Sequence, residues 1–303
     1  MTSPITADQL TPIELGAAER RSFGERATHI ATTTWFGTTI AVGFDTAAAA
    51  DLHARRYARL PGDGAAELCT YAVVEGDATY FWIDRGPAFR WNERLEPPAM
   101  QFLADVVTRT EYFMERSTYQ SFHAAVVGVN GSAAAITAPS TGGKTTTAIA
   151  CVRRGMPLYS DERCIVDGTL ALPFPRALNV RAESIELLTE GAPDDSLLSA
   201  RLAQHRGSDW TFVDYAELFG NAKIPEPRPL RAIFFITRFG RTASVRPMPF
   251  EAAVTELLGA PLRSRARGTA RVVDATRLLR HAQPYGLTLG SPDDTARLIA
   301  QTV

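Results

Sequence analysis

Lys144 and Thr145 are the residues of this chain best suited by type and spacing to bind a phosphate group. They stand in the segment ITAPSTGGKTTTAIACVRRG, residues 136–155, where an apolar run precedes the glycines and a helical pattern follows them. A glycine-rich turn that opens a helix points backbone N–H groups at phosphate oxygens, an ammonium group spans the outer phosphates, and a hydroxyl binds Mg²⁺. The spacing therefore predicts a site for the phosphates of a nucleotide.

The usual phosphate loop has Gly, four residues, and then Gly-Lys-Ser/Thr. Here the first position is Ala138, and every later position fits. Because an alanine needs only an allowed φ there, we expect the loop to hold ATP with Mg²⁺. The alternative is a polar turn before a helix with a solvated lysine. The expected phosphate-binding residues are Ser140, Thr141, Gly142, Gly143, Lys144, Thr145 and Thr146.

Two acids follow the predicted helix, in the segment SDER at residues 160–163. Transfer of a phosphoryl group needs a base for the acceptor hydroxyl and charge neutralisation at the phosphates, with the reacting groups held in line. Asp161, at a strand end, is suited to accept the proton of the acceptor hydroxyl, and Glu162 is suited to hold Mg²⁺ together with Thr145. The residues alone leave these two roles open between the acids, and the family resemblance given below favours Asp161 as the base. An ordinary charged turn is the alternative.

A histidine and two arginines complete the candidate set. His123 stands in the apolar stretch FHAAVVGV, a predicted strand, and we expect it to orient Asp161 or raise its basicity. A core histidine bonded to a carbonyl is the alternative. Arg176 and Arg181 are candidates to bind the transferring phosphate or acidic groups of a peptide, although exposed arginines on a strand are common.

Changes of pattern along the chain predict two domains. Residues 1–115 favour β-branched and aromatic residues punctuated by Gly, Asp and Pro, which indicates a small, mixed β-rich domain of short antiparallel strands that could recognise a substrate. A helix near residues 97–117 marks the boundary. Residues 116–303 alternate apolar strands with amphipathic helices, which indicates an α/β nucleotide-binding domain.

Composition narrows the class of partner. A chain of 303 residues with 45% hydrophobic and 21% charged residues predicts a globular protein, and a net charge of −1 gives no overall field for nucleic acid or an anionic membrane. No stretch has the length of a membrane span or the pattern of a secretory signal, so the cytoplasm is the expected location. Cys69, Cys151 and Cys164 lack metal-like spacing and are expected to be buried thiols.

The order of these segments resembles the catalytic domain of HPr kinase/phosphorylase, and more closely the HPr-kinase-related peptide serine kinases of peptide natural-product pathways. The similarity covers residues 121–187: SFHAAVV, the loop APSTGGKT, RRG at 153–155, SDE at 160–162, and LPFPRALNVRAESIELL. Glu162 stands where the family has Asp, and no segment matches the signature tied to phosphorylase activity. The resemblance therefore implies a kinase domain of the HPr-kinase/PEP-carboxykinase-like type rather than a kinase/phosphorylase.

The resemblance implies transfer of the γ-phosphate of ATP to a hydroxyl, with a serine of a peptide or small protein as the acceptor. Two alternatives stand beside this hypothesis: a kinase for a small molecule such as a sugar or free serine, and a nucleotide-binding regulatory protein without transfer activity. The family also includes homo-oligomers that share catalytic elements, so a homo-oligomer stays open for this chain.

Overall fold

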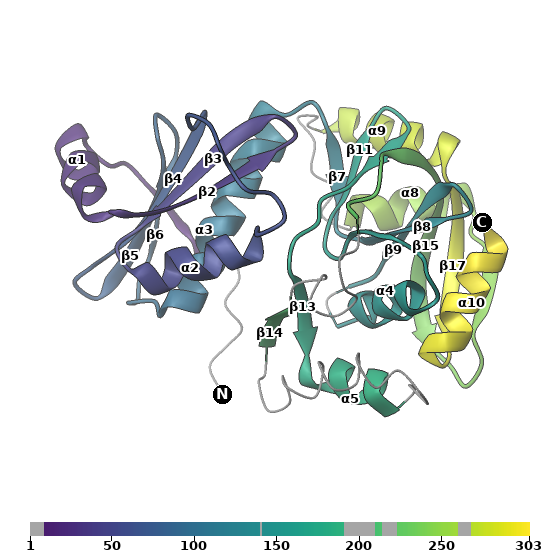
Figure 1. Ribbon diagram of the computed structural model, residues 1–303. Coiled ribbons are helices and arrows are strands. Elements are labelled where there is room, and N and C mark those ends of the chain that lie inside the picture. The colour runs from purple at the N-terminus through teal and green to yellow at the C-terminus, as the bar shows by residue number, and fades with distance from the viewer. Residues whose placement is uncertain (1–8, 140, 191–209, 214–222, 260–267) are drawn as a thin grey trace. The chain divides into compact units, whose positions relative to one another are not determined.

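A computed structural model of the protein describes residues 9–139, 141–190, 210–213, 223–259 and 268–303 (Figure 1). The chain divides into two compact units, Met1–Ser117 and Thr118–Val303. The sequence placed the boundary between residues 115 and 116. Both units combine helices with a mixed sheet, so the α/β class is confirmed.

The first unit is built on a six-stranded sheet with the strand order β1-β6-β5-β4-β3-β2. Its strands are β1 (Thr11–Ile13), β2 (His29–Trp35), β3 (Thr38–Phe44), β4 (Leu68–Glu75), β5 (Ala78–Ile83) and β6 (Ala88–Trp91). Its helices are α1 (Ala17–Arg26), α2 (Ala47–Arg56) and α3 (Pro97–Glu111), the last continuing as the π-helical turn η2 (Tyr112–Arg116).

One strand pair corrects the expectation of purely antiparallel pairing. β3 and β4 run parallel, with Ile40 opposite Leu68. Parallel neighbours need a crossover connection, and α2 supplies it. Thr46 caps this helix by accepting a hydrogen bond from the Ala49 N–H at 3.4 Å. Helix α2 begins directly after this cap, at Ala47.

Helix α3, which the sequence predicted at the boundary between the two domains, belongs to the first unit. Pro97 and Pro98 occupy its first turn, where a missing N–H costs nothing. Its apolar side, which includes Met100, Leu103 and Val107, is buried. Its contacts with α2, β4 and β5 make it part of the core of this unit.

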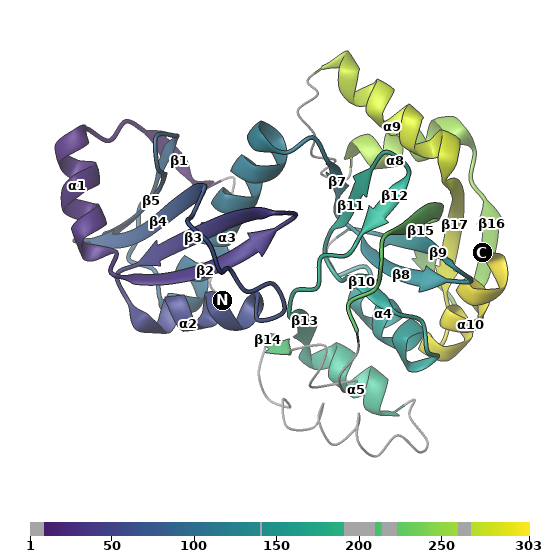
Figure 2. The same cartoon turned by 45° about the horizontal axis from the view of Figure 1, so that its top comes forward.

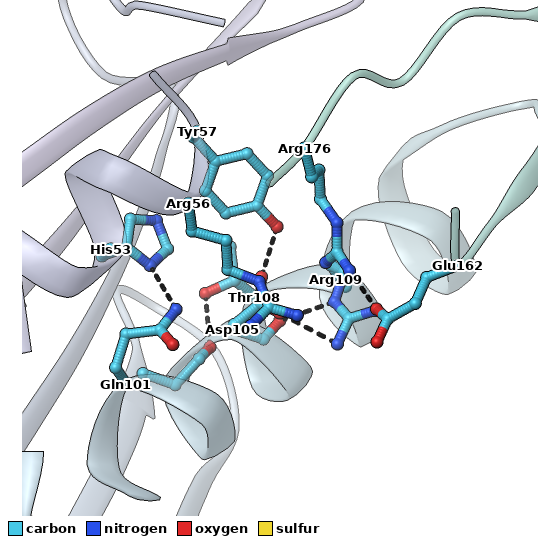
Figure 3. Close-up of polar contacts among 10 residues, drawn as sticks. His53, Arg56, Tyr57, Gln101, Asp105, Thr108, Arg109, Glu162 and Arg176 are labelled. Carbon is cyan, nitrogen blue, oxygen red and sulfur yellow. Dashed lines mark hydrogen bonds and ion pairs between the residues drawn. The ribbon is translucent and has the colours of Figure 1, made fainter. Parts of the chain in front are cut away.

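The core of the first unit also holds a charged cluster, drawn in Figure 3. Asp105 is fully buried. Its Oδ2 lies 3.4 Å from Nε of Arg56 and 2.9 Å from Nη2 of Arg109, and its Oδ1 accepts a hydrogen bond from the Tyr57 hydroxyl. A carboxylate shared by two guanidinium groups and a phenol ties α2 to α3.

We expect Asp105→Asn to lower the free energy of unfolding by about 3 kcal/mol, because it leaves two buried guanidinium groups beside an uncharged amide. Urea unfolding measures the change. Glu75→Gln is the matched control, since the Arg26–Glu75 pair is exposed and its loss costs about 0–1 kcal/mol. Equal midpoints for the two variants would contradict a stabilising role of the cluster.

The second unit is built on a nine-stranded sheet in which β10-β8-β9-β15-β12-β11-β7 form a continuous order and β17 joins β15 to β16. The strands are β7 (Gln120–Phe122), β8 (Ala125–Val129), β9 (Ser132–Thr137), β10 (Leu158–Ser160), β11 (Cys164–Asp167), β12 (Leu170–Leu172), β15 (Arg228–Phe239), β16 (Ser244–Pro247) and β17 (Gln283–Leu289). A separate pair joins β13 (Leu178–Arg181) to β14 (Trp210–Val213).

Helices cover both faces of this sheet (Figures 1 and 2). Helices α4 (Lys144–Arg153) and α10 (Pro292–Thr302) bury Ile149 and Ile299 in the core on one face, which α5 (Ala182–Glu190) extends through Ile185. Helices α8 (Phe250–Gly259) and α9 (Thr269–His281) bury Leu257 and Leu278 on the other face. The alternation of apolar strands with amphipathic helices that the sequence predicted for residues 116–303 is present in this unit.

The strand register brings several chain segments to one edge of the sheet. β9, β15 and β17 are parallel, so their carboxyl ends, Thr137, Phe239 and Leu289, point to the same edge, with β15 extending beyond Phe235, the partner of Thr137. β8 is antiparallel to both β9 and β10, so its start at Ala125 and the end of β10 at Ser160 lie at this edge too. Ligands of open α/β sheets bind beyond the carboxyl ends of the parallel strands.

The three cysteines are free thiols. Cys151 and Cys164 are buried as expected, whereas Cys69 is half-buried. Burial raises the pKa of the Cys151 thiol to about 12, and it raises the pKa of Cys164 as well. Both thiols are therefore protonated at neutral pH. Among the helices of the described residues, none combines the length and apolar character of a membrane span.

Candidate functional site

The predicted loop connects β9 to α4, as the sequence indicated. Ala138 is not among the described residues with positive φ, so this position has no conformational need for glycine, and that prediction is confirmed. A Cβ at Gly142 would lie 2.6 Å from Cβ of Ala138. The methyl group of Ala138 therefore occupies the space beside Gly142, and only glycine fits at position 142.

Two loop residues adopt the left-handed region of backbone conformation. Thr141 has φ +66° and Gly143 has φ +86°. Such a φ strains a threonine by about 1–2 kcal/mol, and strain of this kind concentrates at functional sites. Gly143 is the N-cap of α4, and no side chain caps that helix end. The first backbone N–H groups of α4 are thus presented without a side-chain acceptor at position 143.

We expect Gly143→Ala to lower stability more than Gly155→Ala, and to be the only one of the two that weakens ATP binding. Both glycines have φ near +85°, so both variants carry similar strain. A Cβ at Gly143 would lie 2.7 Å from Cδ1 of Leu289, whereas a Cβ at Gly155 meets nothing within 4 Å. Thermal unfolding and ATP titration measure the two effects. Equal behaviour of the variants would contradict a tightly packed loop.

Lys144 is buried and turns back onto its own loop. Its Nζ donates hydrogen bonds to the main-chain oxygens of Ala138 at 2.8 Å and Pro139 at 2.9 Å. The residue is 7% exposed, so the lysine is not solvated as the alternative of a polar turn expected. That its ammonium group neutralises the outer phosphates of a nucleotide stays a prediction.

Thr145 links the start of α4 to the acidic turn. Its Oγ1 donates a hydrogen bond to Oδ2 of Asp161 at 3.2 Å, and Asp161 directly follows β10. Asp161 is buried. A hydroxyl and a carboxylate are both ligands that Mg²⁺ prefers. The next residue, Thr146, shares a hydrogen bond of 3.0 Å with the hydroxyl of Ser184 at the start of α5.

Glu162 forms an ion pair with Arg176 (Figure 3). Arg176 is buried, and its guanidinium also lies over the ring of Phe174, 5.8 Å from the centroid. The structure thus joins two residues that the sequence gave separate roles, metal binding and phosphate binding. The guanidinium group of Arg176 offsets the charge of the Glu162 carboxylate and so weakens its attraction for a cation.

His123 corrects one expectation, because it does not lie within a strand. It is half-buried in the connection between β7 and β8. Its main-chain oxygen accepts a hydrogen bond of 2.9 Å from the hydroxyl of Thr137, the last residue of β9. The strand predicted from the apolar run at His123 begins two residues later, at Ala125. The connection still lies at the edge where the loop begins.

Two predicted residues cannot be placed fully. Ser140 lies outside the described residues, and only the backbone of Arg181, the end of β13, is described. Two residues beside the site were not singled out from the sequence, Thr137 and Arg163. The hydroxyl of Thr137 holds the main chain of His123, and Arg163 holds the acidic turn by its backbone N–H to Oγ of Ser160 at 3.1 Å and by Nη1 to Oγ of Ser121 at 3.2 Å. Both adjoin a predicted site segment in the sequence. Ser184, which lies in the segment that resembles the HPr-kinase-like proteins, accepts the hydrogen bond from Thr146.

Among the solved structures to which the chain is similar is one described as the Hpr(Ser) kinase/phosphatase from Coxiella burnetii, with 13% identical residues and a TM-score of 0.26. The alignment covers 53% of this chain and 93% of that chain. No family model matches the chain, and no curated protein matches it. A similarity with so low a TM-score supports no conclusion about fold or activity, so both rest on the residues of this chain.

The residues present fit a nucleotide with its Mg²⁺. The tight packing at Gly142 and Gly143, the helix start and the lysine suit phosphates, while Thr145 and Asp161 suit Mg²⁺. In the described part of the chain no group of three or more His, Cys, Asp or Glu residues has metal-site geometry. Mg²⁺ commonly takes one or two protein carboxylates and completes its shell with substrate phosphates and water.

Proposed function

We propose that this protein is a P-loop phosphotransferase that moves the γ-phosphate of ATP, with Mg²⁺, to a hydroxyl group. The observation that carries the proposal is the hydrogen bond between Thr145 and Asp161, which joins the phosphate loop to a buried carboxylate at the same edge of the sheet. Bound Mg²⁺ would neutralise phosphate charge. The sequence resemblance of residues 121–187 to HPr-kinase-like proteins supports the same class.

The roles of the loop residues follow from their positions. Lys144 would exchange its two carbonyl partners for oxygens of the outer phosphates, and the helix N–H groups would bind the remaining oxygens. Thr145 would hold Mg²⁺, and Thr146 would stand beside the inner phosphate at the first turn of α4. As the acceptor oxygen bonds to the γ-phosphorus and the bond to the bridging oxygen breaks, the acceptor proton must move to a base.

The geometry favours a division of acidic roles that differs from the sequence-based one. Asp161 accepts a hydrogen bond from Thr145, whose hydroxyl is our proposed ligand for Mg²⁺. We therefore propose the Asp161 carboxylate as a second Mg²⁺ ligand, and we keep it as the proposed base for the acceptor hydroxyl. Glu162, paired with Arg176, is our proposed anchor for that arginine beside the transferring phosphate. His123, whose carbonyl is bonded to Thr137, would orient the loop edge rather than act from within a strand.

For the acceptor we propose a serine of a peptide or small protein. The support is the sequence resemblance to peptide serine kinases, together with a first unit that has its own sheet and core and is therefore available as a recognition domain. In this proposal the protein works in the cytoplasm and needs neither nucleic acid nor a membrane. The fold of HPr-kinase/PEP-carboxykinase type and a homo-oligomeric state are parts of the same proposal.

The test is transfer of label from γ-labelled ATP with Mg²⁺ to a panel of serine peptides, free serine and sugars. Label on a peptide, lost when Mg²⁺ is removed by a chelator, supports the peptide kinase. Label on free serine or a sugar alone would replace it with a small-molecule kinase. Tight ATP binding with no labelled acceptor across the panel would favour a regulatory protein.

A further inference from the structure

We infer that Phe239 forms a stacking platform for the base of the bound nucleotide. This inference rests on the proposed nucleotide binding and adds a site for the nucleobase to it. Phe239 is the last residue of β15 and is 69% exposed, the highest value among the large hydrophobic residues of the described chain. A flat ligand that covers the ring removes apolar area from water, which is favourable.

The ring lies beside the phosphate loop. A Cβ at Gly143 would be 3.7 Å from Cε1 and 3.9 Å from Cζ of Phe239, so the edge of the ring lies near the residue that caps α4. The same Cβ would lie 2.7 Å from Cδ1 of Leu289, at the end of β17. The side chains of Phe239 and Leu289 therefore form an apolar surface next to the predicted phosphate site.

The main chain under the ring is fixed. Phe239 pairs with Leu289 in the parallel ladder, and the Gly240 N–H donates to the Leu289 carbonyl at 2.8 Å. The preceding residue, Arg238, donates from Nε to the hydroxyl of Thr288 at 3.2 Å. A Cβ at Gly290 would lie 2.4 Å from the Ala243 nitrogen, so the neighbouring connection is packed against the strand end. A ring on a fixed backbone loses little entropy when a ligand stacks on it.

The position suits a base rather than another part of the ligand. A nucleotide held by its phosphates at the start of α4 extends its ribose and base across the carboxyl ends of the parallel strands beside β9, and β15 is the neighbour on that side. Every base has a flat π-face, so a phenylalanine supports adenine and guanine alike. Specific reading of one base would need polar groups in addition.

The test compares three ligands in the presence of Mg²⁺: ATP, GTP and inorganic tripolyphosphate, which has the phosphates without a base. We expect Phe239→Ala to weaken ATP and GTP about tenfold and to leave tripolyphosphate affinity unchanged. Phe239→Trp should keep ATP affinity within about threefold, because it retains an aromatic face. Isothermal titration of the full chain gives all three affinities.

Phe250→Ala is the matched control. Phe250 is also exposed, at 39%, and it opens α8 after β16 at the opposite edge of the sheet, where Pro247 pairs with Tyr285 near the start of β17. The control should leave all three affinities unchanged. Because Phe239 is largely exposed, its replacement is expected to leave thermal unfolding close to that of the wild type.

Each outcome decides the inference. Unchanged ATP affinity in Phe239→Ala, or an equal loss for ATP and tripolyphosphate, overturns the platform while nucleotide binding stands. A change of oligomeric state with unchanged ATP affinity would overturn it in favour of a subunit interface. Wild-type protein that binds neither ATP nor tripolyphosphate would overturn the proposed function itself, and the platform with it.

Discussion

Lys144→Ala is expected to lower the rate of phosphate transfer from ATP at least about a thousandfold. A cationic group on the transferring phosphoryl group is worth about 10³–10⁵ in rate, because its charge acts where negative charge is held in the transition state. The ammonium group is already positioned by the carbonyls of Ala138 and Pro139, so little reorganisation precedes its use. Transfer of label from γ-labelled ATP to the acceptor identified in the panel measures the rate.

The chain offers an unusually clean control for this variant. Only two of its residues are lysines, Lys144 and the exposed Lys223, while the other basic residues are arginines. Lys223→Ala should transfer at the wild-type rate. Lys144→Arg keeps the charge but replaces a compact ammonium by a planar fork, so we expect only partial rescue. Transfer by Lys144→Ala at the wild-type rate would rule out the proposed phosphate site.

Asp161→Asn is expected to lower the transfer rate about a thousandfold while ATP affinity changes much less. The carboxylate is buried and bonded to Thr145, so either of its proposed roles, proton acceptor or Mg²⁺ ligand, is lost with its charge. A thousandfold loss corresponds to about 4 kcal/mol of transition-state stabilisation. Asp167→Asn is the control, because Asp167 is an exposed aspartate on the next strand, β11.

Two further measurements separate the roles of Asp161. If the carboxylate works as a metal ligand, a higher Mg²⁺ concentration restores part of the rate of Asp161→Asn. If it works as the base, added Mg²⁺ restores nothing and the acidic limb of the pH–rate profile disappears. An Asp161→Asn variant with the wild-type rate and pH profile would contradict both roles and return attention to Glu162.

Local patterns in the sequence predicted most elements of the second unit. The turn at Asn130–Gly131 between two apolar runs defines the β8–β9 hairpin, and both residues have positive φ in the structure. The helix of α4 ends before Gly155, as expected of a glycine with φ +84°. These turns and helix ends are determined by residues close together in the sequence, so they can be predicted without knowing the rest of the fold.

Pairings between segments far apart in the sequence could not be predicted from local patterns. No local pattern in residues 38–44 or 68–75 indicates that β3 and β4 run parallel, because the direction depends on the crossover through α2, which packs against β2 and β3. Likewise, the ion pair of Glu162 with Arg176 and the position of Phe239 beside Gly143 depend on how distant segments pack. The sequence correctly predicted that the loop and the acidic turn are neighbours, which the hydrogen bond from Thr145 to Asp161 shows. The metal role of Glu162 stays a prediction.

The parallel pairing of β9 with β15 has a consequence for how the protein acquires its activity. Thr137 pairs with Phe235, roughly a hundred residues later in the chain, and Leu289, which pairs with Phe239, comes later still. Contacts of such high sequence separation form slowly, since the intervening chain must lose much of its freedom first. During synthesis, the phosphate loop would therefore emerge long before the strands that support it. In the proposed function, a nucleotide would bind only after these strands have joined the sheet. Its binding energy would then stabilise the folded protein relative to partly folded states.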